Sequence, residues 1–368
     1  MARFPLAPRH RVAVLMGFLA PLMAVSVSWV AARLLTRRLS RLASIRGHTR
    51  TNLHGESVPT SAGIGWALAL TAGTVVGAPV SELASETVLG GTPLLPSFLT
   101  AVWGFAALGL ADDVWSGHEK GFRGHLGALR RGTLTSGGLK LVGGAIVGLA
   151  AAFPLVPRGH PAGGAPAVMV LATWIVGGLV TALAANAANF LDTAPGRTVK
   201  ATLAAIAIMV GVVAAVTVAG PAGPAGPVTG LGRRPDTVFL VSCAAFAGAL
   251  AGFLPHDLRR RAMLGDAGSN AIGAGLGVLA LALSSHLMAW AVVLVALGLI
   301  NYVGEISSLS RVIHRSRLLA WADGLGRAAA LGRATAFGRT ASCGRAASLG
   351  RATNAARPGR RIYPGREE

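Results

Sequence analysis

Charged and aromatic side chains are scarce in this sequence of 368 residues: 13% are charged and 5% are aromatic, whereas 52% are hydrophobic. This is too little polar surface for a soluble domain of this length. The sequence also has two cysteines, Cys243 and Cys343, which excludes a disulfide framework or a cysteine-ligated metal cluster and predicts free thiols. A lipid bilayer is therefore the expected solvent for most of the chain.

Long apolar runs are abundant. A membrane-spanning helix needs about 20 mostly apolar residues. Eight runs approach or exceed that length, at residues 12–32, 62–80, 92–111, 141–157, 165–185, 201–220, 238–254 and 271–303. The last run is too long for one span and is predicted to break at residues 284–286, although a single long helix is the alternative. The expected fold class is an all-α, polytopic transmembrane bundle of about nine helices.

Basic residues predict the orientation of these helices. The first run could be a secretory signal peptide that ends in the small residues at 29–32. Three arginines precede it and six follow it, however, which favours a retained helix with its N-terminus outside. By alternation, the loops at 33–61, 112–138, 190–200 and 255–269 lie inside and carry fifteen lysines or arginines, against three in the outside loops. We expect a multi-pass protein of the plasma membrane with its C-terminus and its active face in the cytoplasm.

The C-terminal region differs in composition from the rest. Residues 1–304 form the expected membrane domain, and residues 305–368 form an Arg/Gly-rich cytoplasmic tail in which Gly-Arg recurs every six residues from Gly326. Glycine at this spacing disfavours a helix, so the tail is predicted to be disordered from about residue 327. The net charge of +20 lies mostly in the inside loops and the tail, so the expected partner is anionic membrane lipid and not nucleic acid. A low-complexity extension without a task is the alternative for the tail.

Four aspartates lie at the predicted inside ends of apolar runs. Asp112 and Asp113 end the third run, Asp192 follows the fifth, and Asp266 opens the eighth. Each could cap a helix or pair with an arginine. Together, carboxylates from three loops on one face suit Mg²⁺ that holds a diphosphate.

Basic residues of the same loops could complete an anion pocket around such a metal. They are Lys120, Arg123 and the arginines at 259–261.

Sequence blocks around these aspartates resemble a known family. The blocks are residues 58–64 (VPTSAGI), 109–113 (GLADD), 186–192 (NAANFLD) and 263–269 (MLGDAGS). In this order and on one face, they resemble those of the polyprenyl-phosphate N-acetylhexosamine-1-phosphate transferase family. That family is of the glycosyltransferase family 4 type and includes phospho-N-acetylmuramoyl-pentapeptide transferase. The resemblance covers about residues 10–305 and implies a Mg²⁺-dependent transfer of a sugar-1-phosphate from a UDP-amino sugar to polyprenyl phosphate, for cell-envelope glycan synthesis.

The resemblance also implies roles for individual residues. Asp266 would be a ligand of Mg²⁺, and Asp112, Asp113 and Asp192 would take part in catalysis. Substrate-binding roles fall on Asn189, Lys120, Arg123, Gly265, Gly268 and Ser269. The sequence also allows a homodimer.

Three departures from the family pattern keep other functions open. Pro195 stands where the family usually has a second aspartate, Asp257 replaces an asparagine, and the histidine-rich motif of the last cytoplasmic loop is absent. They favour a catalytically inactive member that serves as a binding or scaffold component of envelope assembly. A lipid or ion transporter is a third candidate, but the sequence shows no inverted repeat that would support it.

Overall fold

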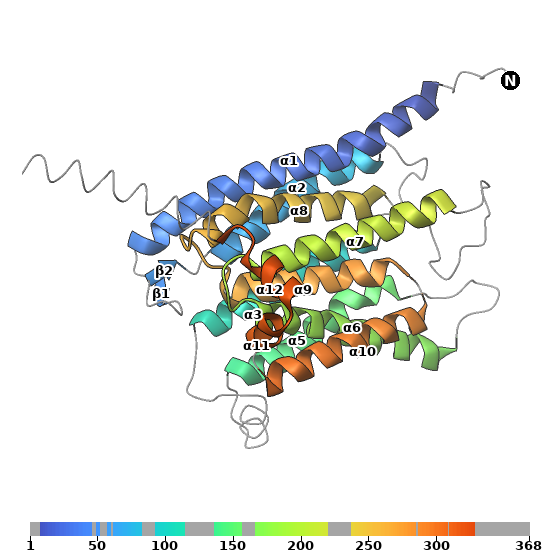
Figure 1. Ribbon diagram of the computed structural model, residues 1–368. Coiled ribbons are helices and arrows are strands. Elements are labelled where there is room, and N and C mark those ends of the chain that lie inside the picture. The colour runs from blue at the N-terminus through green and yellow to red at the C-terminus, as the bar shows by residue number, and fades with distance from the viewer. Residues whose placement is uncertain are drawn as a thin grey trace, which may run out of the picture. The chain divides into compact units, whose positions relative to one another are not determined.

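The computed structural model describes residues 8–45, 49–51, 57–59, 62–82, 93–114, 136–156, 166–219, 237–284, 286–307 and 309–327. The chain divides into two compact units, and all of these residues belong to the first, which ends at Arg327. The long helices are α1 (Pro8–Ile45), α2 (Ala62–Glu82), α3 (Leu94–Val114), α5 (Ser136–Ala152), α6 (Ala167–Leu191), α7 (Arg197–Ala219), α8 (Thr237–Leu258), α9 (Gly265–Ala282) and α10 (Leu287–Ile306) (Figure 1).

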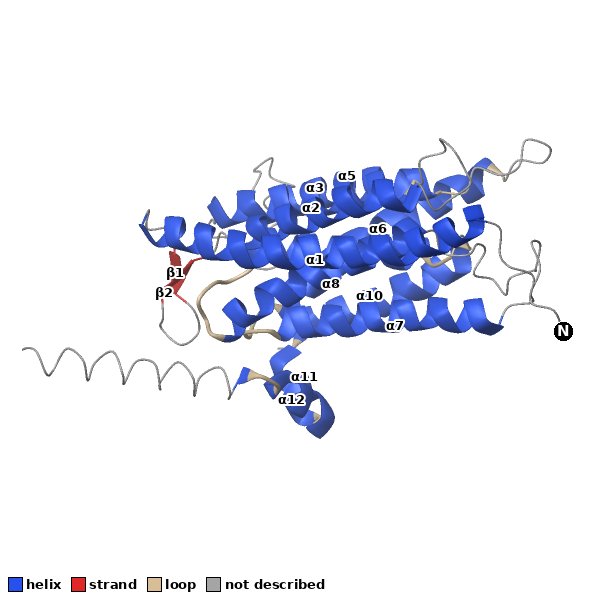
Figure 2. Cartoon of the chain, turned by 90° about the horizontal axis from the view of Figure 1, so that it is seen from above, coloured by secondary structure: helices blue, strands red, loops and turns tan. Residues whose placement is uncertain are grey.

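Shorter elements complete the described part of the chain. The strands β1 (Thr49–Thr51) and β2 (Ser57–Pro59) form an antiparallel hairpin after α1, and the 3-10 helix η1 (Phe153–Leu155) extends α5. Two short helices, α11 (Leu309–Arg315) and α12 (Arg317–Gly324), follow α10 (Figure 2).

Eight of the described helices are long and apolar enough to cross a membrane: α1, α2, α3, α5, α6, α7, α8 and α10. Several of them present large apolar side chains outward, such as Phe18 on α1 with 76% of its surface exposed and Met288 on α10 with 74%. Exposed apolar surface on this scale needs lipid around it. The chain is therefore an all-α, multi-pass membrane protein, as the apolar runs predicted.

Helix α9 is the ninth long helix and lies at the centre of the bundle. It packs against α2, α3, α5, α6, α7 and α8. Thirteen of its 18 residues are buried, and most of these are glycine or alanine, which let neighbouring backbones approach closely. On one side of it, an aromatic core joins Trp66 and Phe98 to Phe246, with ring centroids 5.3 and 5.8 Å apart.

The helices extend beyond the apolar runs that predicted them. Helix α1 continues to Ile45 through a stretch that was expected to be a loop from residue 33, and α8 continues to Leu258. The predicted loop boundaries are wrong here because hydrophobicity marks the part of a helix that lies in lipid, whereas arginine, leucine and serine continue the same helix into water. The predicted break at 284–286 is confirmed, since α9 ends at Ala282 and α10 begins at Leu287.

The predicted tail begins with folded structure. Residues 309–327 form α11, α12 and a short turn that belong to the same compact unit as the bundle. In α12, the Ser316 hydroxyl accepts a hydrogen bond from the backbone N–H of Leu319, which caps the helix. The predicted disorder concerns residues beyond 327, which lie outside the described part of the chain, as does Cys343. Cys243 is a buried free thiol in α8.

Candidate functional site

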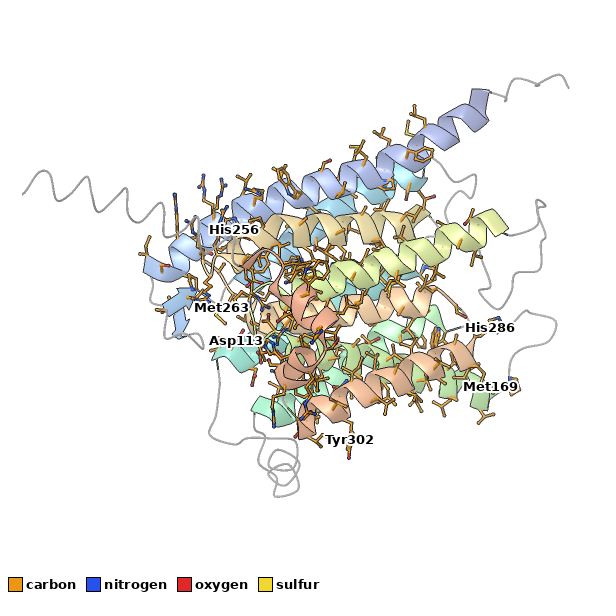
Figure 3. The ribbon with its side chains drawn as sticks, viewed as in Figure 1. Asp113, Met169, His256, Met263, His286 and Tyr302 are labelled. Atoms are coloured by element: carbon orange, nitrogen blue, oxygen red, sulfur yellow. The ribbon has the colours of Figure 1, made fainter. Side chains whose placement is uncertain are left out.

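The beginning of α9 contacts two other helices through glycines. A Cβ atom at Gly109, in α3, would lie 2.2 Å from the carbonyl oxygen of Asp266, and one at Gly63, in α2, would lie 2.4 Å from the backbone nitrogen of Gly268. Only glycine permits these approaches. Both glycines belong to sequence blocks around the expected site, so they bring the end of α3 and the start of α2 onto the first turn of α9. We call this end of the bundle the aspartate end (Figure 3).

Two of the predicted aspartates meet at one lysine. Asp112, in the last turn of α3, places a carboxylate oxygen 2.6 Å from the Lys140 Nζ. Asp266, in the first turn of α9, pairs with the same Nζ. All three side chains are partly exposed, at 22 to 24%. Helices α3 and α9 thus place two carboxylates beside a single ammonium group of α5, at a surface that a substrate can reach.

Asp113 also contacts α9, but through the backbone. Its Oδ2 accepts a hydrogen bond of 3.3 Å from the N–H of Ala267. The first turn of a helix has unsatisfied N–H groups and carries partial positive charge, which a carboxylate stabilises. Asp113 therefore caps a helix, which was the alternative role considered for these aspartates. The capped helix is α9, whereas Asp113 itself belongs to α3.

The end of α6 joins the same cluster. The Ser269 hydroxyl donates to the Asn189 side-chain oxygen at 2.9 Å, which links α9 to α6. Asp192 follows α6 and accepts a hydrogen bond of 3.3 Å from the Thr198 hydroxyl. Burial, and next the charge of Asp257, raise the pKa of Asp192 well above its ordinary range, against the effect of Thr198. The four predicted aspartates thus gather at one end of the bundle.

The remaining predicted site residues have separate placements. Gly265 begins α9 with a φ of 65°, a left-handed conformation, and Gly268 packs against the backbone of Gly63 in the α2–α9 contact. Lys120 and Arg123 lie outside the described residues. Arg260 and Arg261 line a different pocket together with Arg41, so the expectation that they complete the anion pocket at the aspartates is not met in this arrangement.

Sequence reasoning missed Lys140, which is the only charged residue of α5. The predicted span began one residue later, so Lys140 fell in no motif. A lone ionisable side chain at the end of an apolar helix is costly unless it is paired or functional, and this was the available signal.

Sequence reasoning also missed the hydrogen bonds and the ion pair that fix the turn after α6. Asp257, interpreted from sequence as a lost amide, accepts a hydrogen bond of 2.8 Å from the backbone N–H of Gly196. From the other side, Asp323 of α12 binds Arg197, and Arg327 donates to the carbonyl oxygen of Pro195 at 2.8 Å. The turn that contains Pro195 is therefore fixed by a buried carboxylate and by the C-terminal helix.

The donors at the aspartate end fit a hard divalent cation. The described residues contain no group of three or more histidine, cysteine, aspartate or glutamate side chains that could hold a metal. Asp112 and Asp266 do converge on one positive charge. Mg²⁺ is commonly held by one or two carboxylates, with phosphate oxygens of the substrate and water as further ligands. The chemistry of this pair thus suits Mg²⁺ that arrives with a phosphorylated substrate.

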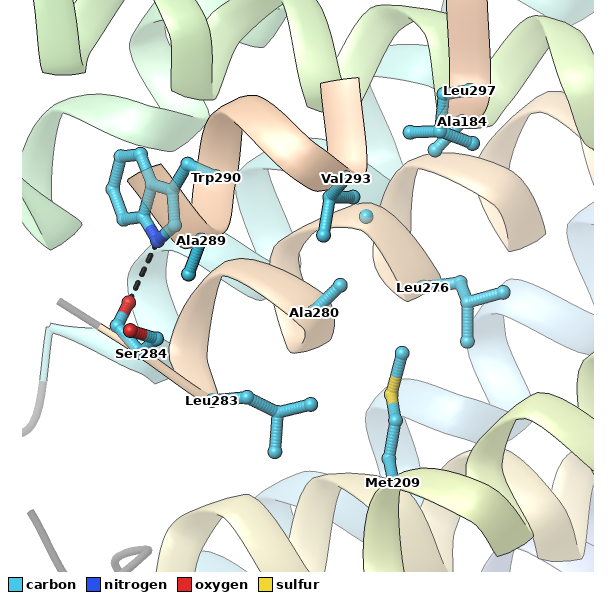
Figure 4. Close-up of a pocket in the computed structure, with 11 residues that line it drawn as sticks. Ala184, Met209, Leu276, Ala280, Leu283, Ser284, Ala289, Trp290, Val293 and Leu297 are labelled. Carbon is cyan, nitrogen blue, oxygen red and sulfur yellow. Dashed lines mark hydrogen bonds between the residues drawn. The ribbon is translucent and has the colours of Figure 1, made fainter. Parts of the chain in front are cut away.

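A second cavity, of about 410 Å³, lies further along α9 between α6, α7 and α10 (Figure 4). Its lining is apolar and includes Met209, Leu276, Val293 and Leu297. At its far end, the Trp290 indole N–H donates to the carbonyl oxygen of Ser284 at 2.7 Å. None of the described residues that line the cavity is ionisable, and its surface suits an apolar chain.

A polytopic helical bundle with carboxylates and a lysine gathered at one end defines a membrane protein with a polar site at the boundary of the bilayer. The sequence model of glycosyl transferase family 4 matches residues 95–284, from the start of α3 to the end of α9. This is more than half of the chain, and the chain belongs to that family, which includes phospho-N-acetylmuramoyl-pentapeptide transferase and related polyprenyl-phosphate hexosamine-1-phosphate transferases. Three of the four recognised blocks lie within the match. A search of curated proteins found no matching relative.

Proposed function

We propose that this protein transfers a sugar-1-phosphate from a UDP-amino sugar to polyprenyl phosphate, at the aspartate end of the bundle. The family membership supports transfer of a sugar phosphate to a polyprenyl phosphate in general. The observation that carries the proposal for this chain is the convergence of Asp112 and Asp266 on the Lys140 Nζ. The reaction brings two anions together, and a site that concentrates fixed charge of both signs is suited to that task.

The proposed reaction is a substitution at phosphorus. A phosphate oxygen of the polyprenyl acceptor attacks the β-phosphorus of the UDP-sugar, the bond from that phosphorus to the bridging oxygen breaks, and UMP leaves. Lys140 would hold a phosphate oxygen of the substrate, since its ammonium is partly exposed at the site. Asp113 would stabilise the start of α9, and Asp192 would connect the end of α6 to Thr198 at the start of α7, beside the substrate.

Asp112 and Asp266 would hold Mg²⁺ when the phosphorylated substrates are present. A bound Mg²⁺ supplies neutralisation of the diphosphate oxygens, which lowers the repulsion between the acceptor and the donor. The protein's part is to fix the two carboxylates on helix ends that pack through Gly63 and Gly109.

The apolar cavity supports a lipid acceptor. It begins near Leu276, ten residues after Asp266, which is about 15 Å along a helix. A prenyl chain whose phosphate lay at the aspartate end could follow α9 to this cavity. We further propose that the protein lies in the plasma membrane, with the aspartate end in the cytoplasm, where UDP-sugars are available for cell-envelope glycan synthesis.

A reconstituted assay tests the proposal. Purified protein is incubated with Mg²⁺, polyprenyl phosphate and a panel of UDP-amino sugars, and UMP release is measured. The proposal requires UMP release that depends on both the acceptor and Mg²⁺. Met209→Trp, which would fill the apolar cavity, should raise the KM for the polyprenyl acceptor and leave the KM for the UDP-sugar unchanged.

An inactive binding or scaffold protein is the second candidate. It is favoured by the turn at Pro195, because the carbonyl oxygen of Pro195 and the N–H of Gly196 are both engaged by the protein's own side chains. A protein of this kind would bind the UDP-sugar or the lipid with Mg²⁺ but would release no UMP.

A further inference from the structure

A basic pocket of about 530 Å³ lies beside the β1–β2 hairpin, and none of its residues belongs to the aspartate site. Three segments that are distant in sequence form it: the end of α1, strand β2 and the turn after α8. Its lining residues are Ser40, Arg41, Ser44, Ile45, Ser57, Pro59, Arg260 and Arg261. Three arginines and three serines therefore line one hollow, and none of the described residues that line it is acidic.

Positive charge extends from this pocket along α1. Arg33 and Arg37 precede Arg41 by eight and four residues, and this spacing places all three on one side of the helix. Like charges gathered in this way repel each other, and an anion among them removes the repulsion. The pocket thus has the electrostatic character of an anion site.

The wall of the pocket is fixed by hydrogen bonds. The Pro59 carbonyl oxygen accepts from the N–H of Met263 at 3.0 Å, which joins the hairpin to the segment before α9. In the turn after α8, the N–H of Arg260 donates to the carbonyl oxygen of Asp257 at 2.8 Å, and that of Arg261 donates to His256 at 2.9 Å. Such bonds hold the arginine-bearing turn in place against α1.

Arg260 has a φ of 55°, the only positive φ at a non-glycine position among the described residues. This left-handed residue ends α8, because the N–H groups of Arg260 and Arg261 donate to the carbonyl oxygens of Asp257 and His256 in the pattern of a helix C-cap. The Ser40 hydroxyl is buried, and no group of the described chain hydrogen-bonds to it. This cap fixes the backbone of Arg260 and Arg261 beside the pocket, and the Ser40 hydroxyl is a polar group there that a ligand would engage.

We infer that this pocket binds a phosphate group, at a site distinct from the aspartates and independent of the proposed transferase activity. Guanidinium groups form paired, charge-assisted hydrogen bonds with phosphate oxygens, and serine hydroxyls donate to the same acceptors. The phosphate could belong to the headgroup of an anionic phospholipid or to a soluble phosphorylated molecule. Both sources present the same chemistry to the arginines.

Binding to the purified protein tests the inference for both sources. In neutral detergent with EDTA, native mass spectrometry counts bound phosphatidylglycerol, with phosphatidylcholine as the neutral comparison, and calorimetry measures binding of inorganic phosphate. The pocket variant Arg41→Gln/Arg261→Gln is compared with Arg38→Gln/Arg315→Gln, which removes two exposed arginines outside the pocket. The two variants lose the same net charge, so a difference between them reports the pocket.

We expect the pocket variant to weaken binding by roughly tenfold or more, because two charge-assisted contacts are lost, whereas the comparison variant should stay within roughly twofold. A loss confined to phosphatidylglycerol assigns the site to a lipid headgroup, and a loss for inorganic phosphate assigns it to a soluble ligand. Ser44→Phe, which fills the pocket without a change in charge, should reproduce the loss if the arginine variant does not fold. Absence of binding by wild type, or an equal loss in the two double variants, would overturn the inference.

Discussion

Asp323 and Arg197, 126 positions apart, form a two-point ion pair in which the guanidinium Nε and Nη2 each lie 2.9 Å from a carboxylate oxygen. Both residues are buried, at 6 and 5% exposure. Arg327 binds the same carboxylate, and the Lys200 Nζ donates to the carbonyl oxygens of Ala322 and Leu325 at 3.0 and 3.1 Å. The C-terminal helix α12 is thereby fastened to the turn that follows Asp192.

Asp323→Asn should destabilise the protein. It leaves Arg197 buried opposite a neutral amide, and breaking a buried ion pair in this way costs about 3 kcal/mol. The measurement is thermal unfolding in detergent, where Tm should fall by several degrees. Arg327→Gln is the matched comparison, and it should have a smaller effect because the Arg327 side chain is 23% exposed. Equal Tm values for Asp323→Asn and wild type would contradict this role for the ion pair.

The ion pair between Asp323 and Arg197 also predicts how the stability lost in Asp323→Asn depends on pH. Burial alone would raise the pKa of Asp323, but hydrogen bonds from Arg197 and Arg327 hold it well below its ordinary value. A depressed pKa gives stabilisation that is complete above the unfolded-state value of about 4 and is lost only as the pH falls below it. The Tm difference between wild type and Asp323→Asn should therefore be the same at pH 6 and pH 8. A difference that vanished between these values would show that another group carries the effect.

Lys140→Gln should reveal the charge balance at the aspartate end. Without the ammonium, Asp112 and Asp266 face each other uncompensated, so Tm in EDTA should fall. Mg²⁺ should then raise the Tm of the variant more than that of wild type, since the same two carboxylates become available to it. Arg38→Gln, at an exposed position on α1, is the control and should leave the Mg²⁺ response unchanged. If Mg²⁺ left the Tm of Lys140→Gln unchanged, this carboxylate pair would not bind the ion.

Gly109→Ala should separate α3 from α9. The added Cβ would lie 2.2 Å from the Asp266 carbonyl oxygen, so the helices must move apart, at a cost of about 1–3 kcal/mol. Gly298→Ala is the matched control, because a Cβ at Gly298 meets nothing within 4 Å, and alanine there should be neutral or slightly stabilising. Thermal unfolding compares the two. If both variants kept the wild-type Tm, the close approach of α3 to α9 would not be needed for stability.

Asp192→Asn should change the pH dependence of stability. An acid whose folded-state pKa is raised binds a proton more tightly in the folded state, so wild-type stability should decrease as the pH rises from about 4 through the raised pKa. Asparagine cannot titrate, and the variant should lose this decrease and gain stability relative to wild type at neutral pH. Tm values measured from pH 4 to pH 8 test this. A decline of the same slope in the variant would assign the titration to another residue.

Most of the membrane architecture could be predicted from the sequence because lipid imposes a simple rule on composition. The apolar runs located every long helix that the structure describes, and the residues at 284–286 marked the break before α10. The helix ends could not be predicted in the same way. Helix α1 continues through Arg33 and Arg37 to Ile45, and nothing in hydropathy distinguishes a helix that leaves the membrane from a loop.

The site could be predicted in part. The aspartates and Asn189 were found because they sit in recognisable blocks at the ends of apolar runs. Lys140 and Asp323 belong to no block, and each binds a residue 126 positions away in the sequence. Asp257 and Pro195 were interpreted as departures from the family pattern, and only the packed structure shows that Asp257 and Arg327 fix this turn.

UMP release by wild type and Asp266→Asn tests the proposed transferase function most directly. Asparagine keeps the size of the side chain but removes the charge that a hard dication requires, so binding of Mg²⁺ should fall while the fold is kept. With Mg²⁺, polyprenyl phosphate and a UDP-amino sugar, wild type should release UMP and Asp266→Asn should release none, at an unchanged Tm. Absence of turnover by wild type with every UDP-sugar, or full turnover by a folded Asp266→Asn, would contradict the account.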